Sequence, residues 1–229
     1  GWLEGSSYTS SWQSWMWKRH AGFDVVTYEG NNTSNTQINH SLNAVPQMIW
    51  IKRRNGTKDW QVGHHGANGG TNPWHYYLEL NEESVESSQE GIWNNTAPTS
   101  TQFTVGNWTQ VNNSSGTYIA MLFTSVSGIS KIGSYTGDGT DDGSNAIDVG
   151  FTPRFLMLKS MNNAGGWYVV DTTRGFSSSA NSPYLRMNET NAQNDGTNTV
   201  RQTSTGFNLY SPGNQFNANG AKVLYYAHA

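Results

Sequence analysis

The sequence predicts an all-β protein, organised as a tandem duplication of an antiparallel β-sandwich of about 105 residues. Three observations support this prediction. Short apolar runs alternate with turns rich in Gly and Asn, no segment shows the helical period of about 3.6, and the sequence repeats internally. Six or so strands of four to seven residues in each half are typical of an antiparallel sandwich.

The repeat is centred on two matching runs, PQMIWIK at 46–52 and PRFLMLK at 153–159. Each run begins with Pro, continues with apolar residues and ends with Lys. Because Pro lacks the N–H of a ladder residue, it suits the first position of a strand. An apolar run of this length next to a turn predicts a strand buried on both faces. Each run is therefore expected to be the central strand of one unit.

The spacing between the two copies holds well beyond these runs. It is 107 (153 minus 46) for aromatic, Gly and Val positions, including Trp60 and Trp167. After a deletion of three residues it becomes 104 (207 minus 103), as for Phe103 and Phe207. A period of this length matches an independent domain of about 100 residues and exceeds the roughly 20–50 of solenoid repeats. We expect one unit at 22–126 and a second at 127–229.

Residues 1–21 belong to neither unit and carry three tryptophans, Trp12, Trp15 and Trp17. The corresponding place before the second unit is held by YIAMLF, which predicts the last strand of the first unit. Residues 1–21 are therefore either the end of a preceding, truncated unit or an N-terminal arm packed on the first unit. Neither strand pattern decides between these interpretations.

In the first unit, the predicted strands are FDVVTY, PQMIWIK, DWQVG, WHYYLEL, TQFTV and YIAMLF, joined by polar loops. Asn55-Gly56, between the second and third of these, is a strong hairpin signal. In the second unit, the predicted strands are KIGSY, FLMLK, WYVV, YLRM, GFNLY and KVLYYA. A jelly roll that uses the whole chain is the alternative fold, and the duplication argues against it.

Composition excludes several functional classes. Charged residues make up 13% of the chain, the net charge is −3 and there is no basic stripe, so binding to nucleic acid is disfavoured. No apolar run approaches the roughly 20 residues that span a bilayer, so membrane insertion is not expected. The lack of Cys fits folding in a reducing cytoplasm, or a domain large enough to need no disulfide. No signal peptide is visible and the chain begins with Gly, so we expect it to be a segment of a longer polypeptide.

One Gly-rich loop, GDGTDDG at 137–143, contains Asp138, Asp141 and Asp142. Calcium takes six to eight oxygen ligands, and such a loop could supply several. However, the loop lacks the spacing and the distal Glu of an EF-hand, and the first unit has no carboxylates at the same place. An ordinary polar turn is the favoured interpretation, and no cofactor is expected.

Two other clusters of polar residues were considered as catalytic or metal sites. His64, His65 and His75 lack the convergent spacing of a zinc site, so surface imidazoles are the expected arrangement. The acidic residues between Glu82 and Glu90 could supply a glycosidase pair, but the second unit is nearly uncharged there, which favours a solvated loop. The sequence contains no nucleophile elbow, P-loop, Rossmann glycine pattern or zincin motif, so no catalytic residue is predicted.

Candidate contact residues come from comparing the two units. An aromatic residue in both copies is explained by the shared fold, whereas one present in a single copy needs another reason. Trp74 aligns with Asn181, Trp108 with Pro212, and Trp93 has no clear partner. With His75 and Tyr76, these tryptophans are the predicted contact residues for a ligand or partner. We expect Trp74, Trp93 and Trp108 to be more exposed than Trp60 and Trp167 and at least two of them to share a face, although local packing beneath the loops is the simpler explanation.

Several motifs together resemble a known family, namely GFDVVTYEGN, INHSLNAVPQMIWIKRR, DWQV, YLEL, NNTAPTSTQFTVG, NNSSGTYIAMLF and KIGSYTGDG. They are similar to a repeated domain of uncharacterised virion proteins, the tail-fibre-like or adhesin-like structural proteins of marine tailed bacteriophages. The resemblance extends from residue 22 to the end of the chain. The longer loop at 64–73 and the additional tryptophans depart from the family pattern. The resemblance brings no catalytic or binding residues with it.

What the resemblance implies is a component of a phage particle, located at the tail and present in several copies. The first hypothesis is therefore a non-enzymatic module of a tail fibre or related appendage, which either contacts a host-surface glycan or builds the shaft. A capsid or tail decoration protein with only virion partners is the main alternative, and a glycan-degrading tail enzyme is a further one. Expected partners are other virion subunits, with a homo-oligomer, specifically a trimer, as the expected assembly. The implied localisation is the virion, extracellular after release and folded in the host cytoplasm.

Overall fold

The computed structural model describes residues 15–179, 182–195, 200–210 and 216–229, and these residues form four antiparallel β-sheets. Helical segments in this part of the chain are single turns. The helical turns are η1 (Ala67–Gly70), η2 (Pro73–His75), α1 (Glu90–Trp93) and α2 (Thr109–Asn112). The prediction of an all-β fold built from antiparallel sheets is confirmed.

The first half of the chain contributes a six-stranded sheet and a two-stranded sheet. The larger has the order β1 (Phe23–Glu29), β8 (Thr117–Phe123), β3 (Met48–Arg53), β4 (Gln61–His64), β5 (Tyr76–Glu79) and β6 (Ser87–Ser88). The smaller pairs β2 (Thr36–Asn39) with β7 (Gln102–Val105).

The second half contributes a five-stranded sheet and a three-stranded sheet. The larger has the order β13 (Leu185–Arg186), β12 (Tyr168–Asp171), β11 (Phe155–Ser160), β16 (Lys222–His228) and β9 (Ser130–Thr136). The smaller has the order β10 (Ala146–Asp148), β15 (Gly206–Leu209) and β14 (Val200–Gln202).

The same strand order recurs in the two halves. The order β1-β8-β3-β4-β5 in the first half matches β9-β16-β11-β12-β13 in the second. Local hydrogen bonds recur as well: the Asn81 side chain accepts from Trp60 N at 2.9 Å, and the Asn188 side chain accepts from Trp167 N at 2.8 Å. These correspondences support the interpretation of the chain as a duplication.

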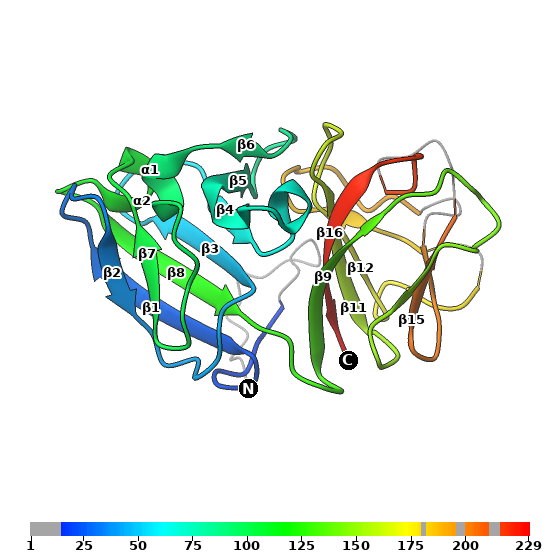
Figure 1. Cartoon of the computed structure of the whole chain (residues 1–229). Coiled ribbons are helices and arrows are strands. Elements are labelled where there is room, and N and C mark those ends of the chain that lie inside the picture. Colours follow the sequence, from blue (N-terminus) through cyan, green and yellow to red (C-terminus); the bar gives the residue numbers. More distant parts are fainter. Residues whose placement is uncertain (1–14, 180–181, 196–199, 211–215) are drawn as a thin grey trace, which may run out of the picture.

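The two large sheets face each other, with one small sheet on the outer side of each. In Figure 1, β2 lies at the left and β15 at the right, with the large sheets between them. Along β3, Ile49 and Ile51 face the small sheet of the first unit, whereas Met48 and Trp50 face the second unit. This alternation follows from the period-two pleat of a strand. The apolar run is therefore buried on both faces, as its sequence predicts.

The polar loop between β5 and α1 connects the two halves. The buried Lys159 donates hydrogen bonds to Glu83 O at 3.2 Å, Ser84 O at 2.8 Å and Gly165 O at 2.5 Å. Gly165 N also donates to Glu83 O at 2.7 Å, and Glu86 N donates to Met161 O at 2.8 Å. The side chains of Glu82, Glu83 and Glu90 are exposed, as expected of a solvated loop, whereas backbone groups of the same loop bind the second unit.

The tryptophans before β1 pack between the two units. The Trp17 ring lies 6.2 Å from Trp50 and 6.3 Å from Phe155, and Trp15 lies 6.0 Å from Phe155. Residues 15–22 contain no strand. For the described part of this segment the structure favours a packed arm over the last strand of a preceding unit. Trp12 lies outside the described residues.

The matching spacing of Trp60 and Trp167 predicts equivalent buried positions, but only Trp167 is buried. Trp167 is fully buried and donates its indole N–H to Glu79 O at 2.8 Å, across the contact between the units. Trp60 is half-buried and lines an open apolar cleft of about 290 Å³ with Trp15, Trp17 and Trp50. Trp167 is thus packed against β5 of the first unit, whereas the ring of Trp60 borders the open cleft.

Candidate functional site

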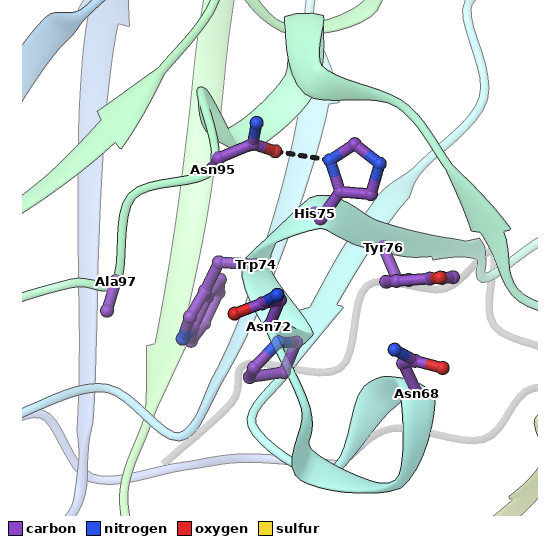
Figure 2. A pocket seen from close by; sticks show the side chains of 8 residues that line it. Asn68, Asn72, Trp74, His75, Tyr76, Asn95 and Ala97 are labelled. Atoms are coloured by element: carbon purple, nitrogen blue, oxygen red, sulfur yellow. Dashed lines mark hydrogen bonds between the residues drawn. The ribbon is translucent and has the colours of Figure 1, made fainter.

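A pocket with a volume of about 530 Å³ lies on the first unit. Its walls come from η1, η2 and the segment after α1. Figure 2 shows the side chains that line it, which are Asn68, Asn72, Pro73, Trp74, His75, Tyr76, Asn95 and Ala97. Most are aromatic rings or side-chain amides.

Trp74 anchors the wall of the pocket to the core. Only 6% of its surface is exposed, and its ring packs edge-on against Trp93 with centroids 5.6 Å apart. Both rings rest on Gly63 of β4, where a Cβ would lie 2.6 Å from Trp74 and 2.7 Å from Trp93. Real Cβ atoms do not approach so closely, so only Gly allows this packing. The rigid sheet thus fixes the position of η2 and of the residues that follow.

Asparagines in the left-handed conformation shape the rim. Asn68, Asn72 and Asn95 line the pocket with φ of 50°, 47° and 51°, and the neighbouring Asn94 has φ of 52°. Asn tolerates this region better than most non-Gly residues, but residues held there tend to cluster at ligand-binding and functional sites. The Gly/Asn-rich sequence around η1 and η2 is therefore used to turn the backbone sharply around the pocket.

Two hydrogen bonds hold polar side chains of the pocket in place. His75 Nδ1 and Asn95 Oδ1 are hydrogen-bonded, as the dashed line in Figure 2 shows. Because a carbonyl oxygen only accepts, Nδ1 carries the proton, and Nε2 of the neutral ring is an acceptor. The Asn68 amide donates from Nδ2 to Thr71 O at 2.8 Å.

No Asp, Glu, Lys or Arg is among the residues that line this pocket. The nearest carboxylate contact on its wall is Glu86, which accepts a hydrogen bond from Asn68 N at 2.8 Å. Burial raises the pKa of Glu86, and this hydrogen bond and the charge of Lys222 act in the opposite direction. The pocket therefore offers neutral hydrogen-bonding groups beside aromatic surface.

The structure brings three of the five predicted contact residues to this pocket and corrects the predicted exposure. Trp74, His75 and Tyr76 line it, whereas Trp93 is 1% exposed and lies beneath it, and Trp108 packs half-buried on the same core cluster. Trp74 and Trp93 are thus less exposed than Trp60, which is the reverse of the expectation. They fill the space above Gly63, so local packing explains their presence in only one unit.

The structure differs from the predicted arrangement of the histidines, whereas the loop with the three aspartates is the polar turn that the sequence favours. His64 is fully buried, not on the surface, and its ring lies 4.9 Å from that of His65. In the loop at 137–143, Asp138 accepts from Thr140 N and Asp142 from Ser144 N, both at 2.9 Å. Among the described residues, no group of three His, Asp or Glu side chains is placed to hold a metal ion, so Asp138, Asp141 and Asp142 form a turn.

Sequence reasoning missed the three asparagines Asn68, Asn72 and Asn95. The available signal was the Asn and Gly content of the loop at 64–73. A loop of this composition predicts turns, but it does not say which amides converge.

The fold and site define a two-unit, all-β protein with a neutral polar and aromatic surface pocket. A family model described as a domain of unknown function (DUF7483) matches residues 9–229, so the chain belongs to this family. No curated protein matches the chain.

Among solved structures, one described as "Crystal Structure of the STIV MCP" shows a weak similarity to this chain. The two are 8% identical, the alignment covers 90% of this chain and 85% of the other, and the TM-score is 0.19. A score this low does not establish a common fold. None of the helices in the described residues has the length and apolar character needed to cross a membrane.

Proposed function

We propose that this chain is a non-enzymatic component of a bacteriophage virion, a module of a tail fibre or related appendage that contacts a host-surface glycan. The virion assignment rests on the family resemblance of the sequence motifs. The glycan contact rests on one structural observation, the pocket where the side chains of Asn68, Asn72, His75, Tyr76 and Asn95 converge.

The chemistry of these side chains matches that of a sugar. Each sugar hydroxyl both donates and accepts, and a side-chain amide offers both a donor and an acceptor. The C–H face of a sugar ring is apolar and suits contact with an aromatic ring such as Tyr76, which is half-buried. The volume of about 530 Å³ lies within the range of about 300–1,000 Å³ that is common for ligand pockets.

Glycan-array binding by the intact chain tests this proposal, with Tyr76→Ala as the variant. We expect the wild type to bind a defined set of glycans and Tyr76→Ala to lose most of that signal. Thermal unfolding of both proteins separates loss of binding from loss of folding. Absence of binding by the folded wild type to all members of the array contradicts the glycan function.

The second candidate is a structural virion protein whose only partners are other virion subunits. The observation that favours it is the apolar cleft at the contact between the units, lined by four tryptophans with Leu80, Met121 and Met187. Open apolar surface of this kind is typical of protein interfaces. Mass measurement of the intact chain tests this candidate: a homo-oligomer, specifically a trimer, is expected, and a monomer at all concentrations contradicts it.

A further inference from the structure

We infer that the pocket on the first unit selects a neutral saccharide over an anionic one, and that the amides of Asn68 and Asn72 read its hydroxyl groups. This inference rests on the proposed glycan function and specifies its ligand class. Three features of the pocket support it: its lack of charged side chains, the hydrogen-bonding capacity of its amides, and the backbone conformation of the residues that carry them.

The charge of the pocket disfavours an anion. Recognition of a carboxylate, sulfate or phosphate group draws on Arg or Lys in direct contact, and neither lines the pocket. The nearby cation, Lys222, lies beyond Gly69 and interacts with the Glu86 carboxylate. An acidic sugar placed here would leave its charge unpaired, which is costly when the charge loses contact with water.

Several hydrogen-bonding groups of the pocket remain available for a ligand. Within the described residues, the Asn72 amide has no hydrogen-bond partner in the protein, so both its donor and its acceptor are free. Three side-chain atoms are likewise not used by the bonds that hold these residues: Asn68 Oδ1, Asn95 Nδ2 and His75 Nε2. A mixture of donors and acceptors complements adjacent hydroxyls of a sugar ring.

The backbone that carries these amides is fixed before a ligand arrives, and the Asn68 amide is also held by its bond to Thr71 O. Asn68 and Asn72 flank the bend between η1 and η2, and both are in the left-handed region. The bend itself is held by the hydrogen bond from Thr71 N to Asn68 O at 3.3 Å and by that from His75 N to Asn72 O at 3.0 Å. Figure 2 shows Asn68 and Asn72 together with Trp74 and Tyr76 among the side chains that line the pocket, so it combines amides with aromatic rings. A preorganised site loses less entropy on binding.

The left-handed conformation also provides a clean variant. Gly adopts positive φ without strain, so Asn72→Gly removes the amide while keeping the backbone. The same reasoning applies to Asn68→Gly. The matched control is Asn32→Gly, because Asn32 is exposed, has φ of 58° and does not line the pocket.

The test uses the intact chain on an array of neutral oligosaccharides of glucose, galactose, mannose and N-acetylglucosamine, together with acidic oligosaccharides containing uronic or sialic acid. The strongest binder is then titrated by calorimetry against the wild type and the three variants. We expect a neutral binder, at least a tenfold loss of affinity in Asn72→Gly and Asn68→Gly, and wild-type affinity in Asn32→Gly.

The outcomes separate this inference from the proposed function. A strongest binder that is acidic overturns the inference and leaves the glycan function standing. A neutral binder with equal affinity for the wild type, Asn68→Gly and Asn72→Gly overturns the assignment of the site. If the folded wild type binds no glycan on the array, both the inference and the proposed glycan function are contradicted.

Discussion

At the residue scale, two equivalent lysines show how position changes the role of one side chain. Lys52 and Lys159 end the two apolar runs, and each ammonium binds a carbonyl of the following turn, Lys58 O and Gly165 O, at 2.5 Å. Lys159 alone also reaches two carbonyls of the other unit and is fully buried. Burial lowers its pKa to about 8, and the charge of Glu83 acts in the opposite direction.

Replacing Lys159 with Met should therefore destabilise the protein more than the same change at Lys52. Lys159→Met removes the Lys donor from Ser84 O and Gly165 O, whereas Glu83 O keeps its bond from Gly165 N, and each buried carbonyl left without a donor costs about 1–3 kcal/mol. We expect the free energy of unfolding to fall by at least about 2 kcal/mol. Lys52→Met should cost less than about 1 kcal/mol, because Lys52 is half-buried and bonds only within its own hairpin. Chemical denaturation of the two variants measures both values, and equal losses would show that the contact between units contributes nothing.

His64 is a second buried titratable residue, and it makes stability depend on pH. Burial and the neighbouring His65 hold the pKa of His64 well below its usual range. Its Nδ1 accepts from Gly66 N at 2.9 Å, which favours the neutral ring. The unfolded chain has a His pKa of about 6.5, so below that pH the unfolded state binds a proton that the folded state does not.

Acid should therefore destabilise the wild type more than His64→Gln, which cannot take up this proton. We expect the free energy of unfolding of the wild type to fall progressively from pH 6.5 towards pH 5. His65, whose pKa is also lowered by burial, contributes in the same direction and is present in both proteins. Denaturant titrations at a series of pH values compare the two slopes. Parallel curves would mean that His64 is not buried neutral.

At the scale of elements, the central strands illustrate what the sequence predicts well. The apolar runs that form β3 and β11 are recognisable because both faces are apolar and a Pro precedes each run. The hairpin from β3 to β4 lies where the sequence predicts one, although neither Asn55 nor Gly56 adopts a positive φ. The burial of Trp74 and Trp93 is different, because it depends on a glycine in β4 that is distant from Trp93 in sequence. Local pattern contains no information on that pairing.

The two tryptophans that follow the central strands should differ in their contribution to stability. Trp167→Ala removes a fully buried ring and should cost about 3–5 kcal/mol. Trp60→Ala should cost less than about 2 kcal/mol, because the ring is half-buried at an open cleft and loses less buried area. Denaturant unfolding of the intact chain measures both. A larger loss at Trp60 than at Trp167 contradicts the packing described above.

At the scale of the whole molecule, the sequence predicts two units but not how they face each other. The shared core cluster contains Met48 and Trp50 from the first unit and Met157 and Tyr226 from the second. The sequence shows only that these residues belong to strands that are apolar on both faces. It does not show that the layer packed against one face is the large sheet of the other unit. The pocket likewise could not be predicted as a whole, because it combines η1 and η2 with the distant Asn95.

The arrangement of the two units affects how the molecule can be used. The face-to-face contact buries the inner sides of both large sheets, whereas the pocket opens on the first unit, near the Gly/Asn-rich turn of η1 and η2. A module in a virion appendage would need this surface free, whereas a decoration protein with only virion partners would not. The position of the chain in the particle therefore distinguishes the two proposals.

A density map of the intact particle tests the central claim most directly. If the chain is a receptor-contacting module, it will lie on a distal appendage with Asn68, Asn72 and Tyr76 facing solvent. A chain embedded in the capsid or tail shell, with a neighbouring subunit seated over these residues, would contradict the account.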